Sequence, residues 1–150
     1  MTSRRPLAVL TAIGVAAVGS VALMLAAPAQ AEAAQPTPCS AAANACVDLS
    51  TQQAWLMRNG VVVYGPVSVR TGRSSAPTDP GTFHVTFKDK RHVSSIFHVA
   101  MPYSVFFNGG DAFHLGSLAV SSHGCVHLSR KAAVTFFNTL HVGDEVQVVR

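Results

Sequence analysis

Turn-forming residues divide most of this chain into short apolar segments, each too short for a helix of ordinary length. Asn59-Gly60 is the residue pair of a tight hairpin, and it joins the apolar segments 54–57 and 61–64. The stretch 82–88 alternates apolar and polar residues strictly, which is the pattern of a strand with one buried face. From residue 46 onwards the sequence therefore predicts a mostly β domain.

Further strands and one helix are expected along the same stretch. Gly65-Pro66 is expected to end one strand. The other expected strands are 47–49, 67–69, 97–101, 104–107, 112–114 and 146–149. Residues 129–140 instead carry Ala133 and Phe136 at helical spacing, with Ser129 placed to cap the helix. The expected fold is a β-sandwich or barrel of short strands with one conspicuous helix.

The first residues have the features of a secretory signal peptide. Arg4 and Arg5 precede an uncharged apolar run at 7–27, and Ala29-Gln30-Ala31 is a small-residue cleavage site. The apolar run is nearly long enough for a membrane anchor, but the cleavage site favours removal of the leader. We therefore expect an exported protein.

Removal of this leader leaves one domain with a modest charge. The expected boundaries are 1–31 for the signal peptide, 32–45 for a linker rich in Ala, Pro and Gln, and 46–150 for the folded domain. Two of the 11 Lys and Arg residues lie in the leader, so 9 remain against 7 Asp and Glu, a net charge of about +2. The positive charges form no extended cluster, so no nucleic-acid partner is expected. The cleaved protein is expected to be a secreted monomer without a membrane partner.

The chain has three cysteines, which is an odd number for an exported protein. Cys39 and Cys46 are seven positions apart at the start of the domain, and we expect them to form a disulfide that fixes the N-terminal segment to the first strand. Cys125 is then left as a free thiol, and a single unpaired cysteine in such a protein is a candidate reactive group.

Cys125 lies in an unusual local sequence, directly after Gly124 and between His123 and His127. A thiol is a good nucleophile only as the thiolate, and a neighbouring imidazolium or a helix N-terminus can lower its pKa. Gly124 allows a tight turn that exposes the sulfur atom. The amide groups of such a turn can stabilise an oxyanion. The pattern predicts a cysteine enzyme that transfers acyl groups.

A cysteine nucleophile needs a base, and the spacing does not select one of the three candidates, His114, His123 and His127. If the segment is extended, His123, Cys125 and His127 share a face. A zinc site is an alternative, but ligands at i, i+2 and i+4 suit tetrahedral coordination poorly, so we expect no metal and no cofactor. The other alternative is a buried structural cysteine with histidines at the surface.

The segment Ser122-His123-Gly124-Cys125-Val126, followed by Leu128, resembles the signature of L,D-transpeptidase catalytic domains of the YkuD-like family. The resemblance covers roughly residues 46–149 in the family's order. Its other landmarks are the segments 47–53, 77–83, 101–103 and 142–146 and a glycine four positions before His114. The resemblance implies that 46–150 is an L,D-transpeptidase catalytic domain with a β-rich fold.

The resemblance also implies an activity on the peptide stems of peptidoglycan. Such enzymes release the terminal D-alanine of a tetrapeptide stem, form a thioester, and pass the acyl group to a side-chain amine of a neighbouring stem as a 3→3 cross-link. Cys125 would be the nucleophile and His114 the base, with its ring oriented by the backbone carbonyl that follows. His123 and Gly124 would shape the turn and the oxyanion site.

The remaining residues implied by the resemblance are contacts of the substrate, namely Ser122, Tyr103 and His127. His127 stands where the family has Arg or Asn, and Leu115 stands where it has Gly. Two alternative functions stay open. An L,D-carboxypeptidase would pass the same thioester to water, and an inactive wall-binding domain would keep the fold without turnover.

Overall fold

The structure, a computed structural model, describes residues 36–150, and the expected signal peptide at 1–31 lies outside them. The elements in chain order are β1 (Ala45–Asp48), β2 (Gln53–Arg58), β3 (Val61–Arg70), β4 (Gly81–His84), β5 (Phe87–Val93), β6 (Ala100–Asn108), β7 (Asp111–Leu115), β8 (Val126–Leu128), α1 (Arg130–Thr139) and β9 (Glu145–Val149). The expected class, mostly β with one conspicuous helix, is confirmed for this part of the chain.

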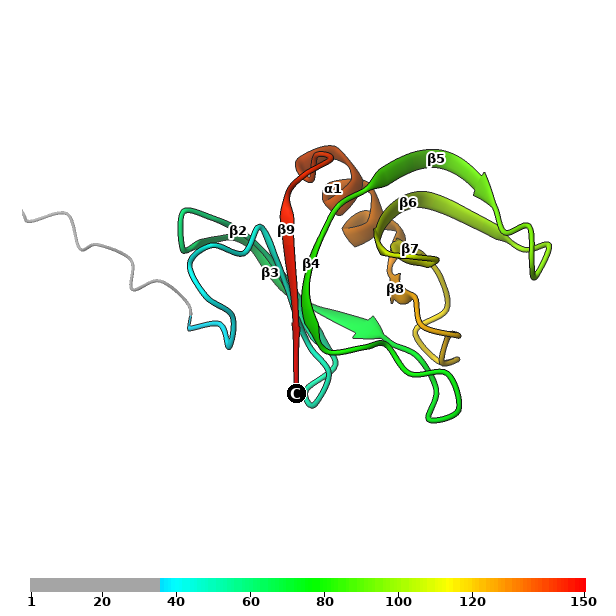
Figure 1. The fold of residues 1–150 in the computed structure, drawn as a ribbon, viewed down its shortest axis with the longest axis horizontal. Coiled ribbons are helices and arrows are strands. Elements are labelled where there is room, and N and C mark those ends of the chain that lie inside the picture. Colours follow the sequence, from blue (N-terminus) through cyan, green and yellow to red (C-terminus); the bar gives the residue numbers. More distant parts are fainter. Residues whose placement is uncertain (1–35) are drawn as a thin grey trace, which may run out of the picture. The chain divides into compact units, whose positions relative to one another are not determined.

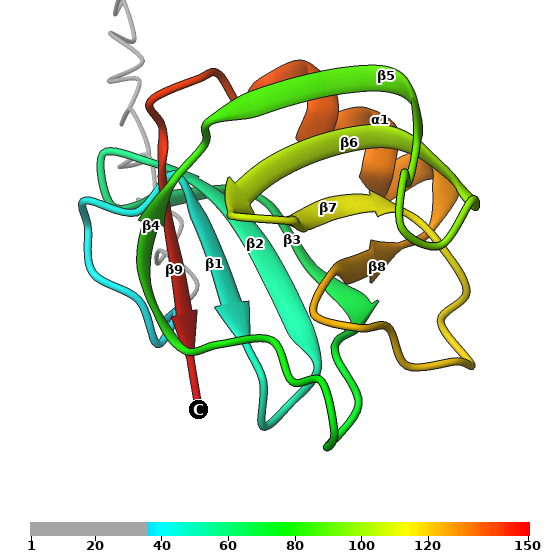
Figure 2. The same ribbon diagram turned by 45° about the vertical axis from the view of Figure 1, so that its right-hand side comes forward.

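The strands form one nine-stranded sheet in the order β4-β9-β1-β2-β3-β8-β7-β6-β5. Figure 2 shows that this sheet curls into a half-barrel. The curl brings β4 towards β6, where the rings of Phe83 and Phe107 lie 5.9 Å apart. None of the helices in residues 36–150 is long and apolar enough to cross a membrane.

The main core lies between one face of the curled sheet and α1, as Figure 1 shows for the helix beside β6, β7 and β8. The helix begins after Ser129, whose hydroxyl accepts a hydrogen bond from the amide of Ala132, so the expected cap is confirmed. Ala133 and Phe136 are fully buried against the sheet. The Phe136 ring meets the Phe113 ring of β7 at 5.0 Å.

Two expectations about strand boundaries are wrong. Gly65-Pro66 does not end a strand, because β3 runs through it. The register between β2 and β3 shifts at this point, and a bulge is a place where the missing amide hydrogen of proline is tolerated. The stretch 82–88 is not one strand either. It leaves β9 after His84, and at Phe87 it joins β6.

Residues 97–99 were expected to belong to a strand, but β6 begins only at Ala100. The structure also contains β8, which the sequence pattern did not indicate. This strand has only three residues, and it is held between β3 and β7. Because β8 separates Cys125 from α1, the N-terminus of the helix does not lie at the thiol.

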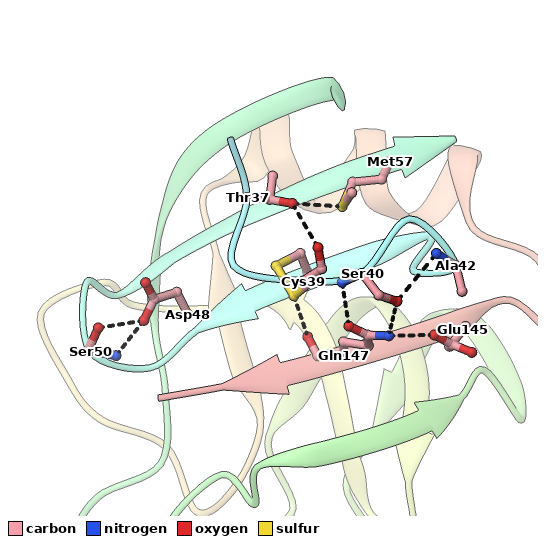
Figure 3. The surroundings of a disulfide bond; sticks show 10 residues. Thr37, Cys39, Ser40, Ala42, Asp48, Ser50, Met57, Glu145 and Gln147 are labelled. Carbon is pink, nitrogen blue, oxygen red and sulfur yellow. Dashed lines mark hydrogen bonds between the residues drawn. A yellow bond between two sulfur atoms is a disulfide. The ribbon is translucent and has the colours of Figure 1, made fainter. Parts of the chain in front are cut away.

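The N-terminal segment packs on the far side of the sheet from the main core (Figure 3). A disulfide joins Cys39 to Cys46 in β1. The amide of Ser40 donates a hydrogen bond of 2.9 Å to the side-chain oxygen of Gln147 in β9. Ala43 is 1% exposed. Although 32–45 was expected to be a linker, the folded domain therefore includes residues before Cys46.

Candidate active site

Strand alternation places the candidate catalytic residues on the face of the sheet that is turned away from the main core. In β7 the side chain of Phe113 enters the core, so its neighbour His114 points to the opposite face. In β8 Val126 enters the core, so Cys125 and His127 share the face of His114. The parallel register pairs His114 with His127, which leaves Cys125, directly before β8, diagonal to His114.

These side chains line a cavity of about 790 Å³. It extends beneath the loop that joins β5 to β6. The cavity is lined by His92, Ser94, Ser95, Ile96, Phe97, Val99, Met101, Phe106, Gly110, Asp111, His114, Val120, Ser121, Ser122, His123, Cys125 and His127. Its volume is in the range of small-molecule sites, which makes it the candidate active site.

A tight turn holds Cys125 at the floor of the cavity. Gly124 has a φ of 120°, which residues with a Cβ atom rarely adopt. A Cβ atom at Gly124 would also lie 2.1 Å from Oδ1 of Asp111. The Ser122 hydroxyl donates a bond of 2.5 Å to the carbonyl of Cys125 and accepts one of 3.2 Å from the amide of Gly124. Ser122 is buried, holds the turn and also lines the cavity, and its expected contact with the substrate stays a prediction.

Thr78 supports the same turn from the loop before β4, and sequence reasoning did not single it out. Its hydroxyl donates a hydrogen bond of 2.6 Å to the carbonyl of Gly124. The same oxygen accepts one of 2.9 Å from the amide of Gly72. Thr78 is 2% exposed, so water does not replace these partners easily. In the sequence, the only indication of this role is that a residue with a hydroxyl group follows Pro77.

Thr78→Val is expected to lower the free energy of unfolding by about 1–3 kcal/mol, because it leaves a buried carbonyl and a buried amide unpaired. The acylation rate of Cys125 should fall with it, since the turn that presents the thiol loosens. Chemical denaturation and an active-site labelling rate measure the two effects. Thr82→Val, at an exposed position of β4, is the matched control. Equal stability of the two variants would contradict the role of Thr78.

His114 is held as a neutral imidazole. It is 6% exposed, and its Nδ1 lies 2.9 Å from the carbonyl oxygen of Leu115. A carbonyl can only accept, so Nδ1 carries the hydrogen and Nε2 keeps its lone pair. This is the carbonyl expected to orient the ring. Burial lowers the pKa of His114 to about 4, against an ordinary value of 6.5. The imidazole is therefore uncharged at neutral pH.

The thiol is also uncharged at rest. Burial raises the pKa of Cys125, and the nearby Asp111 carboxylate raises it further. The Cys125 sulfur lies 3.7 Å from the carbonyl oxygen of Gly110, which can accept the thiol hydrogen. The expectation that an imidazolium or a helix N-terminus lowers the thiol pKa is thus wrong. The Cys125 thiol and the His114 imidazole are both buried, which favours their uncharged forms, and α1 begins beyond β8. The arrangement suits proton removal at the moment of attack.

The other two histidines occupy different places. His127 packs edge-to-face on the His114 ring at 4.8 Å, and its Nδ1 lies 2.9 Å from the carbonyl oxygen of Ser117. His123 is exposed and stacks on Phe97 at 4.6 Å. His123 lines the same cavity as Cys125 and His127. Of the three candidates only His114 is buried, and its ring, like that of His127, is oriented by a backbone carbonyl.

Tyr103 was expected to line the pocket, but its side chain lies elsewhere. Its ring packs against Phe137 of α1 at 5.9 Å, beside the main core. The residues of β6 that do line the cavity are Met101 and Phe106. Within residues 36–150, no three His, Cys, Asp or Glu side chains are grouped so that they could hold a metal ion.

The fold of this chain has counterparts among solved structures. The chain is similar to an L,D-transpeptidase from Stackebrandtia nassauensis, with 33% identity and a TM-score of 0.68 over 71% of this chain and 54% of that one. L,D-transpeptidase 1 of Mycobacterium tuberculosis is 28% identical, with a TM-score of 0.63 over 71% and 60%. The L,D-transpeptidase of Xylanimonas cellulosilytica is 27% identical, with a TM-score of 0.67 over 76% and 64%.

The chain thus spans between 54% and 64% of the length of these three structures. No curated sequence is significantly similar to it. The sequence profile of the L,D-transpeptidase catalytic domain, however, matches residues 43–148, which include the sheet, the helix, the turn at Gly124 and both His114 and Cys125. With this match and the shared fold, the chain belongs to the L,D-transpeptidase family.

Proposed function

We propose that this protein is a secreted L,D-transpeptidase that forms 3→3 cross-links between tetrapeptide stems of peptidoglycan through a thioester at Cys125. One observation carries the proposal. The free thiol lies directly before β8, the buried His114 lies on the neighbouring strand β7, and both line one cavity, while the Nε2 lone pair of His114 is not used by its hydrogen bond to Leu115.

The acylation step follows from the protonation states of the two residues. His114 takes the thiol proton through Nε2 as the Cys125 sulfur attacks the carbonyl carbon of the bond before the terminal D-alanine. The tetrahedral intermediate places its oxyanion near the turn, where the amide of Cys125 can donate to it. The intermediate collapses with cleavage of the C–N bond. The proton then passes from His114 to the departing amine, and the acyl group stays on sulfur.

The proposed location rests on two features. The signal-peptide pattern at 1–31 predicts export. The disulfide between Cys39 and Cys46 fits an oxidising compartment outside the cytoplasm. The cell wall is the place where a secreted enzyme of this kind would meet its substrate, and the isolated domain is proposed to act as a monomer.

Incubation of the purified protein with a disaccharide-tetrapeptide tests the proposal. Mass spectrometry is expected to show free D-alanine, a cross-linked dimer, and a protein species with the tripeptide acyl mass on the peptide that contains Cys125. D-Alanine with tripeptide as the only other product would identify an L,D-carboxypeptidase. The absence of both product and adduct would indicate a wall-binding domain without turnover.

A further inference from the structure

Asp111 is a charged residue of the candidate cavity that the acylation step proposed above does not use. It is the first residue of β7, between Gly110 and Ala112, whose backbone groups both lie near the Cys125 sulfur. Its carboxylate lies against Gly124, so closely that no Cβ atom fits there. No residue within 36–150 donates a hydrogen bond to this carboxylate, and none forms a salt bridge with it. Its charge is therefore free to meet a ligand.

The surroundings of Asp111 make this charge costly in the free enzyme. Burial, with the nearby charge of Asp79, raises the pKa of Asp111 to about 6. The carboxylate in turn raises the pKa of the Cys125 thiol and so opposes thiolate formation. A carboxylate beside a nucleophilic thiol thus hinders the first step of the reaction. Its effect changes once the sulfur is acylated, because a thioester carries no charge that Asp111 can repel.

The cavity holds no opposite charge for Asp111. Its lining contains one carboxylate, that of Asp111, and neither lysine nor arginine. The remaining lining is apolar or consists of hydroxyl and imidazole groups. A cation that enters beside the thioester therefore has one strong partner, and a charged hydrogen bond is the strongest polar contact such a cavity can offer.

We propose that the Asp111 carboxylate binds the primary ammonium group of the acceptor stem beside the thioester, and that it thereby favours transfer to an amine over hydrolysis. This inference rests on the proposed function and adds to it the residue that distinguishes the two acceptors. Water carries no charge, so Asp111 gives it no comparable preference.

The groups already present account for every bond and proton in the transfer to the amine. The ammonium, held by Asp111, loses one proton to solvent. The resulting amine nitrogen attacks the thioester carbonyl carbon, so that a C–N bond forms and the C–S bond breaks. The second proton leaves the nitrogen for Nε2 of His114, which passes it to the departing sulfur of Cys125. The free thiol and the neutral imidazole are thus restored.

The test compares how the same thioester divides between an amine and water in the wild-type protein and in Asp111→Asn. The wild-type protein and Asp111→Asn are acylated with tetrapeptide donor, and the adduct on Cys125 is first measured by mass spectrometry. The ratio of cross-linked dimer to tripeptide is then determined with a stem that carries a free amine. Asp111→Asn is expected to acylate at least as fast as the wild type, and its ratio should fall by about 10- to 100-fold, the size of a charged hydrogen bond.

Three controls separate binding of the ammonium from general damage. Hydroxylamine is a largely uncharged nucleophile at pH 7.5, so its partition against water should be the same in both proteins. Asp79→Asn removes a nearby charge that does not line the cavity, and it should keep a ratio close to wild type. Asp111→Glu, which restores the charge, is expected to recover part of the ratio.

The outcomes distinguish the two proposals. An unchanged ratio in Asp111→Asn, or an equal loss with hydroxylamine, would overturn the role of Asp111 and leave the thioester chemistry intact. A wild-type thioester that passes only to water would identify an L,D-carboxypeptidase, so the proposed transpeptidation would fail together with this inference. If the wild-type protein forms no adduct at Cys125, the proposed function itself fails, and this inference fails with it.

Discussion

Cys125→Ala is expected to abolish formation of the acyl-enzyme and of both products. Cys125 is the free thiol of residues 36–150, and its sulfur lies in the cavity that also contains His114. Removal of the nucleophile from a covalent mechanism typically costs on the order of 10⁶ in turnover, which here means no detectable product. Intact-mass spectrometry after incubation with the tetrapeptide donor measures the effect.

The control for this variant is its stability. Cys125 packs partly buried beside Met101, Phe106 and Ala112, and loss of one sulfur atom there should change the free energy of unfolding by only about 1 kcal/mol. A folded protein without an adduct is therefore the expected result. If Cys125→Ala still gains the acyl mass, the nucleophile is another residue, and the mechanism proposed above is wrong.

Elements that depend on local pattern could be predicted from the sequence. The helix follows from the spacing of Ala133 and Phe136 and from the cap at Ser129, all of which act within a few residues. The strand boundaries at Gly65-Pro66 and within 82–88 could not be predicted. Each depends on a partner strand that is distant in sequence, because a bulge against β2 accommodates Pro66 and a change of partner from β9 to β6 divides 82–88.

The residues of the candidate site could likewise be predicted only where they are close in sequence. Gly124 and Cys125 are adjacent in the chain, so their turn was predictable, and the spacing to His114 allowed a base from the next strand. Thr78 and Asp111 could not be identified, because only the fold brings them to Gly124. The sequence pattern places His123, Cys125 and His127 on one face, and all three line one cavity in the structure.

His114→Ala is expected to slow acylation of Cys125 by about 10²–10⁴-fold at pH 7, the usual contribution of a general base. The thiol cannot compensate, because burial raises its pKa and little thiolate is present without a base. His123→Ala is the matched control. Its ring lines the same cavity, but it is exposed and stacks on Phe97, so its effect should be much smaller.

The pH dependence of acylation distinguishes a base from a structural residue. Because the pKa of His114 is lowered to about 4, the imidazole stays neutral and able to accept a proton well below its ordinary value of 6.5. The wild-type rate should therefore hold as the pH falls through 6.5, and it should decline only as the pH approaches 4. This acid limb should vanish in His114→Ala and persist in His123→Ala. Wild-type acylation in His114→Ala would show that another group removes the thiol proton, and His127, which packs on the same ring, would be the next residue to change.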